Sequence, residues 1–480
     1  MIVRAVREHG RKKPSSAALT FERTPGQVER WSYQQLARYI DRLIDGLSGK
    51  GSDDEAVALV MTAEGETVAA LLAAAQLGRP SLLLPSTLPA DEARIVLEQS
   101  GISLLFVPPG AREWISTVCM DGSSGWITAG SLEDASPRAG SLPHDCICQL
   151  TSGSTGASRL AVRTWEGVQA ELEAVCKRAS IGPDDTVLST GSIAHSYSLM
   201  GGVLAPLLTG AEALLGANAA DSSRLADQIQ PTLIFGLPAT YQVMLQRPTT
   251  DVALQRTRLA LSAGAPLPAR LFEAFARRFR LPIRQDYGTT ETGTITIDTS
   301  GEVQEGCAGE PLPHLQLRLV KPEDIPLNGV ETGEIQVRGA ATARAYLSGR
   351  KLIPCLDEDG WYHTGDAGFF DAVQRLWVGR RLRPAIRVAG VDVRPEAVEN
   401  AIQALPGVRD VVALGIHDAQ RRPAIKAVVV APGLEMREIE DWCRRQLPPE
   451  QQPAVLELRE ELPRSPAGKI LQKYLVGDES

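Results

Sequence analysis

The sequence of 480 residues has no long hydrophobic run. Its apolar stretch at residues 68–77 is about half as long as a membrane-spanning helix, and no apolar run follows the basic N-terminal residues as it would in a signal peptide. We therefore expect a cytoplasmic protein with no membrane partner.

Cysteine is scarce, and basic charge is not in excess. The seven cysteines are scattered, and an odd number cannot pair completely within one chain. Cys146 and Cys148 have no second pair of ligands nearby, which argues against a zinc site and leaves reduced thiols as the default. The formal net charge of −8 is spread along the sequence, which argues against a nucleic-acid partner.

The chain is longer than one hydrophobic core usually supports, so at least two domains are expected. Residues 32–108 alternate helix and strand patterns, which is typical of a mainly parallel sheet with helices on its faces. Residues 120–144 are rich in Gly, Ser and Pro and predict a surface loop. From about residue 310, short alternating segments indicate antiparallel strands instead.

We predict an α/β fold. Residues 1–382 would form a large N-terminal domain with mainly parallel sheets, helices and a β-barrel-like portion, and residues 383–480 a small, mobile α+β domain. The predicted helices are 32–50, 67–77, 89–100, 395–403 and 435–446. The predicted strands are 56–60, 81–84, 103–107, 186–190, 233–235, 259–262, 312–320, 333–339, 375–382, 387–393, 411–417 and 424–431.

A loop rich in glycine and hydroxyl groups follows the apolar run CICQL, and its sequence is TSGSTG at Thr151–Gly156. Such a loop can present backbone N–H groups and hydroxyls to phosphate oxygens. It does not fit the Walker A pattern, and by composition alone it could equally be a plain linker.

The full string resembles the phosphate loop of the adenylate-forming superfamily, which contains acyl- and aryl-CoA synthetases, peptide-synthetase adenylation domains and firefly-type luciferases. The usual Pro-Lys-Gly continuation is replaced by Ser158, Arg159 and Leu160. Arg159 keeps the positive charge with which the loop could grip departing pyrophosphate. The resemblance implies that the phosphates of ATP contact Thr151, Ser152, Gly153, Ser154, Thr155 and Gly156.

Further motifs follow in the order that the superfamily has them. Taken alone, YGTTE at Tyr287–Glu291 is a polar turn, but it resembles the YGxTE motif. The resemblance implies that Tyr287 stacks on adenine with Gly288 and Thr289 beside the nucleotide, and that Thr290 holds the α-phosphate. Glu291 would bind Mg²⁺, for which a hard oxygen ligand is suitable.

The motif GWYHTGD resembles WxxTGD and implies that Asp366 accepts hydrogen bonds from the ribose hydroxyls. RRLRPAIRVAG resembles the superfamily's hinge segment, although the arginine run could also be a solvated basic face. The gapless alignment makes Arg381 the ribose-contacting arginine and Arg383 the hinge, where Asp or Lys is usual. It places Arg387 and Gly390 at the thiol channel.

LPRSPAGKI, near residue 470, resembles the LPRTxxGKI ending and makes Lys469 the main catalytic cation. In the superfamily this lysine contacts both the substrate carboxylate and the α-phosphate. A lysine near the end of a chain is otherwise an ordinary solvated charge.

The segment GSIAHSYSL corresponds to the first part of the acid pocket. No carboxylate lies between Thr186 and Ala211, so an α-amino acid is disfavoured because its ammonium group would be buried unpaired. We expect an aromatic or a short to medium aliphatic acid. His195 would lie near its acyl group, but it could also be a plain core histidine. The residues expected to line the pocket are His195, Tyr197, Gly236, Ala263, Gly264 and Gly288.

The resemblance implies an enzyme that uses ATP and Mg²⁺ to convert a small-molecule carboxylic acid to acyl-AMP and then passes the acyl group to a thiol. The expected thiol is coenzyme A, and the phosphopantetheine of a separate acyl carrier protein is the alternative. Two other functions stay open: an oxygenase that uses the acyl-AMP, and a non-catalytic nucleotide-binding regulator. The regulator draws on the replaced Pro-Lys-Gly and the arginine hinge, but the presence of Thr290, Glu291, Asp366, Arg381 and Lys469 argues against it.

Overall fold

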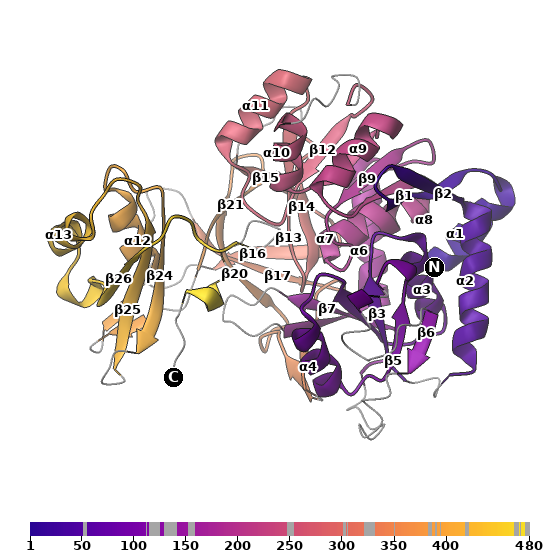
Figure 1. Cartoon of the computed structure of the whole chain (residues 1–480), viewed down its shortest axis with the longest axis horizontal. Helices are drawn as coiled ribbons and strands as arrows, with labels where there is room; N and C mark the ends of the chain where they lie inside the picture. The colour runs from indigo at the N-terminus through magenta and orange to yellow at the C-terminus, as the bar shows by residue number, and fades with distance from the viewer. Residues whose placement is uncertain are drawn as a thin grey trace. The chain divides into compact units, whose positions relative to one another are not determined.

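The computed structural model describes residues 1–50, 55–111, 113–114, 125–128, 142–151, 159–246, 254–300, 304, 306–320, 332–349, 351–382, 386–388, 391–393, 395–417, 422–464, 470 and 472–475 (Figure 1). These residues fall into two compact units, one up to Gly379 and one from Arg380 onward. The predicted division into domains 1–382 and 383–480 stays a prediction, although its boundary lies near this one.

The first unit contains an eight-stranded sheet in the order β19-β18-β8-β7-β4-β3-β5-β6. Its central strands β5, β3, β4 and β7 are parallel, and the outer pairs are antiparallel. The strands are β3 Val57–Met61, β4 Ser81–Pro85, β5 Leu104–Val107, β6 Gly125–Thr128, β7 Cys146–Thr151, β8 Arg159–Thr164, β18 Ala345–Ser348 and β19 Lys351–Pro354. The central strands are buried throughout, which explains their unbroken apolar sequences.

The second sheet of this unit has 13 strands in the order β16-β17-β20-β21-β15-β14-β13-β12-β11-β9-β10-β1-β2. The run from β1 to β13 is parallel, and the strands from β14 to β16 pair in the antiparallel sense that the short alternating segments predicted. The strands are β1 Ala17–Thr24, β2 Gln27–Ser32, β9 Thr186–Thr190, β10 Glu212–Gly216, β11 Leu233–Gly236, β12 Leu259–Ser262, β13 Ile283–Thr289, β14 Gly293–Ile297, β15 Cys307–Pro311, β16 Leu315–Val320, β17 Gly333–Gly339, β20 Tyr362–Phe370 and β21 Leu376–Arg381.

Helices cover both faces of the parallel strands. Helices α9, α10 and α11 pack on one face around Ile234 and Ala260, as Figure 1 shows, and α6 packs on the other face around Val187 and Phe235. The helices of this unit are α1 Ile2–Lys12, α2 Tyr33–Ser48, α3 Gly65–Gln76, α4 Ala90–Ser100, α6 Trp165–Ala179, α7 Ser196–Leu199, the π-helical turn Met200–Leu204, α8 Ala205–Thr209, α9 Ala219–Ile229, α10 Pro238–Gln246 and α11 Ala269–Phe279.

Local sequence signals explain where individual helices begin. Ser32 and Gln35 form a reciprocal capping box at the start of α2, so two backbone N–H groups that lack helical partners are bonded. Thr164 caps α6 by accepting a hydrogen bond from the Gly167 N–H at 3.1 Å. These caps fix the points at which the chain leaves β2 and β8.

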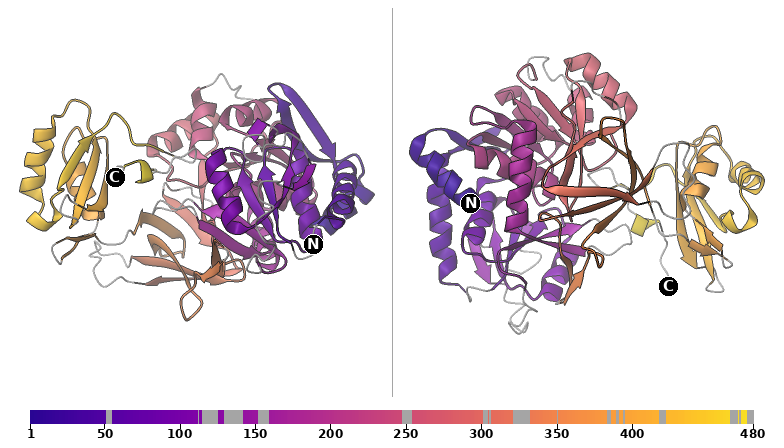
Figure 2. Two further views of the ribbon diagram at one scale, coloured as in Figure 1. Left: turned by 60° about the horizontal axis from the view of Figure 1, so that its bottom comes forward. Right: turned by 180° about the vertical axis from the view of Figure 1, so that it is seen from behind.

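The second unit is a small α+β structure. Strands β24 Asp410–His417, β25 Pro423–Val430 and β26 Val455–Leu458 form one sheet, and helices α12 Pro395–Gln403 and α13 Met436–Gln446 pack on it through a shared apolar core (Figure 2). The predicted α+β class and the α/β class of the first unit are therefore confirmed.

Two local predictions were wrong. The segment at 387–393 is not one strand, because β22 Ile386–Val388 pairs in antiparallel fashion with β23 Val391–Val393. The segment at 120–144 is not all loop, because β6 pairs with β5. An aromatic contact supports that pairing, since the rings of Trp126 and Phe106 lie 5.1 Å apart between centroids.

A buried ion pair between Arg163 and Glu171 joins the two sheets of the first unit. Their side chains are 1% and 0% exposed. Arg163, in β8, also donates to the Ala341 carbonyl at 2.8 Å and to Ser196 Oγ at 3.1 Å. Glu171, in α6, accepts the Thr294 N–H of β14 at 2.8 Å. Every polar contact of the pair therefore holds a different segment of the chain.

Replacement of Glu171 by Gln should lower the stability of the first unit by about 3–5 kcal/mol, because the Arg163 guanidinium would stay buried without its counter-charge. Urea titration followed by tryptophan fluorescence measures the loss. The variant Arg163→Met/Glu171→Leu should recover much of it, since no charge is then buried. The matched control is Asp41→Asn in the exposed Arg7–Asp41 pair, for which we expect less than about 1 kcal/mol. Equal effects of Glu171→Gln and Asp41→Asn would contradict the structural role of the pair.

Candidate nucleotide and acid site

The predicted phosphate loop connects two paired strands. β7 ends at Thr151 and β8 begins at Arg159, and these two residues are partners in the antiparallel register. Thr151 is buried, whereas Arg159 is exposed, with its guanidinium carbon 5.3 Å from the centroid of the Tyr346 ring. The remaining predicted loop residues, Ser152, Gly153, Ser154, Thr155 and Gly156, lie outside the described residues.

The YGTTE motif forms the turn between β13 and β14. Thr289 and Thr292 brace this turn by exchanging hydrogen bonds of 3.2 Å between backbone N–H groups and side-chain hydroxyls. A Cβ on Gly288 would lie 2.3 Å from the Gly293 carbonyl oxygen, so this position accepts only glycine. Thr290 is half-buried between these braces. The motif therefore occupies a tight, well-braced hairpin.

The hairpin places Tyr287 against Asp366, and both residues belong to motifs with a predicted nucleotide role. The Tyr287 hydroxyl donates to Asp366 Oδ2 at 2.8 Å, although the two residues are 79 positions apart in sequence. Thr364 supports the aspartate, since its Oγ1 accepts the Asp366 N–H at 3.1 Å and donates to the Ile335 carbonyl at 2.7 Å. An aromatic ring and a carboxylate side by side are suited to an adenine base and its ribose hydroxyls.

Glu291 is 8% exposed and is held by neutral groups. Its Oε1 accepts the Tyr346 hydroxyl at 2.8 Å, and the Tyr346 and Tyr362 hydroxyl oxygens are 3.3 Å apart. Burial and the Glu291 charge raise the pKa of both tyrosines, so each stays a neutral phenol at neutral pH. Among the described residues no basic side chain pairs with Glu291.

This environment fits a divalent cation. The hydrogen-bond partners of the Glu291 side chain in the described part of the chain are neutral phenols, so no counter-charge there offsets it. The described residues contain no group of three or more His, Cys, Asp or Glu side chains that could hold a metal. A single protein carboxylate is what Mg²⁺ needs when most of its other ligands are nucleotide phosphates and water.

The predicted hinge and thiol-channel residues are only partly described. Arg381 is the last residue of β21 and is exposed, and Arg387 is an exposed residue of β22. Arg383, Gly390 and Lys469 lie outside the described residues. Their roles stay predictions.

The predicted acid pocket gathers at the carboxyl ends of β9, β11 and β12. His195 is exposed just before α7, and Tyr197 in α7 lies 5.7 Å from the Phe235 ring between centroids. Gly236 ends β11 opposite Ser262, so Ala263 follows directly on the neighbouring strand. This edge of a parallel sheet is where ligands of open α/β folds bind.

Two of the pocket glycines have a packing reason for being glycine. A Cβ on Gly236 would lie 2.6 Å from the Tyr241 hydroxyl, which donates to the Leu261 carbonyl across the strand. Gly264 has φ = +82°, a conformation that side chains disfavour. Whether these positions also touch the acid stays a prediction.

Sequence reasoning missed a buried carboxyl group, Asp286, next to the site. It immediately precedes Tyr287 and is 6% exposed, and its Oδ2 has no hydrogen-bond partner among the described residues. Burial raises the pKa of Asp286 well above its usual value, and the Glu171 charge adds to this shift. The buried Tyr197 hydroxyl likewise lacks a partner in the described part of the chain. An acidic residue within β13, directly before the YGTTE motif, was the signal that could have found Asp286.

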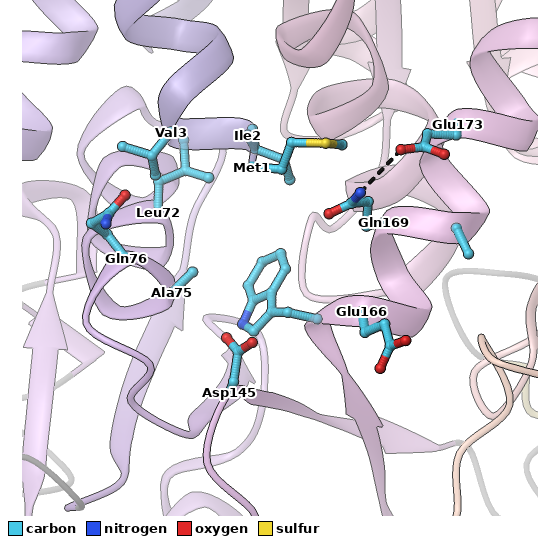
Figure 3. A pocket seen from close by; sticks show the side chains of 12 residues that line it. Met1, Ile2, Val3, Leu72, Ala75, Gln76, Asp145, Glu166, Gln169 and Glu173 are labelled. Atoms are coloured by element: carbon cyan, nitrogen blue, oxygen red, sulfur yellow. Dashed lines mark hydrogen bonds between the residues drawn. The ribbon is translucent and has the colours of Figure 1, made fainter.

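A cavity of about 460 Å³ lies elsewhere in the first unit, beside α1 and the start of α6 (Figure 3). Three carboxylates line it, from Asp145, Glu166 and Glu173, and Gln169 donates to Glu173 at 3.0 Å. No lysine or arginine lines this cavity, and its three carboxylates outnumber the α-amino group of Met1, which disfavours phosphates. It contains none of the predicted site residues.

Comparison with known families defines the class. Residues 6–347 match the model of the AMP-binding enzyme family, and residues 397–469 match the AMP-binding enzyme C-terminal domain. The chain belongs to the AMP-binding enzyme family, and within it to the AMP-forming acid–CoA ligases, which adenylate an acid with ATP.

Individual relatives agree with this assignment. Feruloyl-CoA synthase of an Amycolatopsis species is 30% identical over 455 residues, covering 92% of each chain. Indoleacetate–CoA ligase of Aromatoleum aromaticum is 28% identical over 468 residues, covering 92% of this chain and 91% of the ligase. O-succinylbenzoate coenzyme A synthetase of Bacillus subtilis, solved with ATP and magnesium, is 22% identical with a TM-score of 0.73, covering 99% of each chain. No helix in the described part of the chain is long and apolar enough to cross a membrane.

The raised pKa of Asp286 predicts a pH-dependent effect of Asp286→Asn. The folded state binds the proton more tightly than the unfolded state, so wild-type stability falls as pH rises from about 3.9, the unfolded value, through the raised folded value. Asparagine does not titrate, so the thermal midpoint of the variant relative to wild type should increase from about pH 5 to about pH 9. Asp45→Asn, at an exposed position, is the control and should show no such trend. A midpoint difference that is independent of pH for Asp286→Asn would contradict the assignment.

Proposed function

We propose that this chain activates an aromatic or a short to medium aliphatic carboxylic acid as its acyl-AMP and transfers the acyl group to coenzyme A. The observation that carries the proposal is the β13–β14 hairpin. In it the Tyr287 hydroxyl donates a hydrogen bond to Asp366, and Glu291 accepts one from the Tyr346 hydroxyl. One rigid turn thereby offers a surface for adenosine and a charged ligand for the metal that accompanies ATP.

In the first step a carboxylate oxygen of the acid attacks the α-phosphorus of ATP. A new O–P bond forms, the bond from the α-phosphorus to the bridging oxygen breaks, and pyrophosphate leaves in line. The work of the protein is positioning and charge neutralisation. Asp366 and Tyr287 hold the nucleoside, Thr290 and Lys469 hold the α-phosphate, and Arg159 receives the pyrophosphate. Mg²⁺, when bound through Glu291, would neutralise phosphate charge.

In the second step the thiol sulfur attacks the acyl carbon, the thiol proton is lost to solvent, and AMP leaves with the bonding electron pair. The small domain would turn about Arg383 between the two steps, which removes Lys469 from the site and exposes the thiol channel at Arg387 and Gly390. Motions of this kind commonly separate half-reactions. The names of the CoA-dependent relatives support coenzyme A over a carrier protein as the acceptor.

Three observations support the nature of the acid. No carboxylate is available for an α-ammonium group between Thr186 and Ala211. Asp286 favours its neutral form because of its burial, so it would be a poor partner for a cation. Feruloyl-CoA synthase and indoleacetate–CoA ligase both act on aromatic acids by their names.

Exchange of labelled pyrophosphate into ATP tests the proposal across a panel of acids. Ferulate, benzoate, indoleacetate, octanoate and phenylalanine make up the panel, and an aromatic or aliphatic acid without an ammonium group should support the fastest exchange. Exchange with phenylalanine alone would contradict the predicted pocket. Binding of ATP without exchange for any acid would favour a regulator, and oxygen consumption would favour a luciferase-like enzyme.

The two half-reactions should respond differently to Lys469→Ala. Acyl-AMP formation should fall by roughly 10²–10³-fold, because one preorganised cation at the reacting phosphate is lost. Thioester formation from added acyl-AMP and coenzyme A should keep most of its rate, since the lysine acts only in the first step. Stopped-flow measurement of each half-reaction checks this. Equal loss in both would contradict the role of Lys469.

A further inference from the structure

Tyr346 stands between two groups of opposite charge in the proposed site. It is a half-buried residue of β18, and the register pairs it with Ala161 of β8, two positions after Arg159. β18 is therefore fixed to the strand that begins where the phosphate loop ends. The motifs singled out from the sequence did not include this tyrosine.

The hydroxyl of Tyr346 orients the carboxylate of Glu291. A phenol has one proton, and the 2.8 Å bond to Glu291 Oε1 uses it. The Tyr362 hydroxyl lies 3.3 Å from the Tyr346 hydroxyl and is also hydrogen-bonded to Glu291. The Ala343 N–H donates to the Glu291 carbonyl at 2.6 Å, which fixes the backbone of the same residue. The backbone and the side chain of Glu291 are therefore both held by residues between Ala343 and Tyr346.

The ring of Tyr346 supports Arg159. The guanidinium carbon lies 5.3 Å from the ring centroid, within the range of a cation–π contact. The pairing of β8 with β18 places Arg159 and Tyr346 on adjacent strands and so keeps them close together. One side chain thus touches the proposed metal ligand with its hydroxyl and the proposed pyrophosphate-binding cation with its ring.

We infer that Tyr346 is a positioning residue that sets Glu291 for Mg²⁺ and Arg159 for pyrophosphate at the same time. The inference rests on the proposed function, which gives Glu291 and Arg159 those roles. Groups that orient a metal ligand commonly change metal affinity by 10–100-fold when they are removed.

The hydroxyl and the ring can be tested separately in the full-length chain. Tyr346→Phe removes only the hydroxyl, so the Mg²⁺ concentration for half-maximal pyrophosphate exchange should rise roughly tenfold. Calorimetric titration with a non-hydrolysable ATP analogue should show the same loss at limiting Mg²⁺, whereas AMP, which does not need the metal, should bind as in wild type. Tyr346→Leu removes the ring as well and should also raise the KM for pyrophosphate by several-fold.

Controls separate positioning from simple packing. Tyr39→Phe alters another half-buried tyrosine, packed on Trp31, and should leave the Mg²⁺ midpoint unchanged. An unchanged Mg²⁺ midpoint for Tyr346→Phe would overturn the inference. So would an equal loss of AMP affinity, because that result would indicate a purely structural role.

Glu291→Gln distinguishes failure of the inference from failure of the proposed function. If Glu291→Gln raises the Mg²⁺ midpoint and Tyr346→Phe does not, only the inference is wrong. If wild type shows no exchange, or if Glu291→Gln leaves the midpoint unchanged, the proposed function itself loses its metal ligand and the inference falls with it.

Discussion

The ion pair of Arg163 and Glu171 is the constraint on which the first unit depends. The pair joins β8 of the eight-stranded sheet to helix α6, and Glu171 of α6 in turn bonds to β14 of the 13-stranded sheet. Burial of two charges is costly unless every polar atom is satisfied, and here the remaining bonds reach Ala341, Ser196 and Thr294. In this arrangement the bonds of both charged groups are distributed over four segments of the chain.

The proposed site is built on the segments that this pair fixes. Thr294 lies just after the YGTTE turn. Ala341 lies two residues before Ala343, whose N–H donates to the Glu291 carbonyl. The position of Glu291 is therefore set from both sides, by its own hairpin and by the segment leading into β18. The Tyr346 hydroxyl holds the Glu291 side chain by a hydrogen bond in the same way. The predicted nucleotide contacts, Tyr287 and Asp366, are on β13 and β20, which are not adjacent in the 13-stranded sheet.

Much of the fold and part of the site could be predicted from the sequence, for reasons that individual residues show. Buried parallel strands such as β3 and β4 are continuous apolar runs, and a capped amphipathic helix such as α2 has clear signals at its start. The motifs predicted a nucleotide role for Tyr287 and for Asp366, which stays a prediction, but not the hydrogen bond that joins the two side chains. The contacts of Arg163 and Tyr346 could not be predicted, because their partners lie up to 178 residues away and no local pattern encodes them. The strand predicted at 387–393 failed because a short alternating run does not show where the chain reverses.

The central claim is that a carboxylate oxygen attacks the α-phosphorus of ATP at this site. The most direct test is to incubate the enzyme with ATP, coenzyme A and an acid labelled with ¹⁸O in its carboxylate, and to analyse the nucleotide product by mass spectrometry. The account predicts that AMP forms and carries one ¹⁸O atom, because the oxygen that joins phosphorus stays with AMP when the thiol attacks. Formation of ADP, or of AMP without the label, would contradict it.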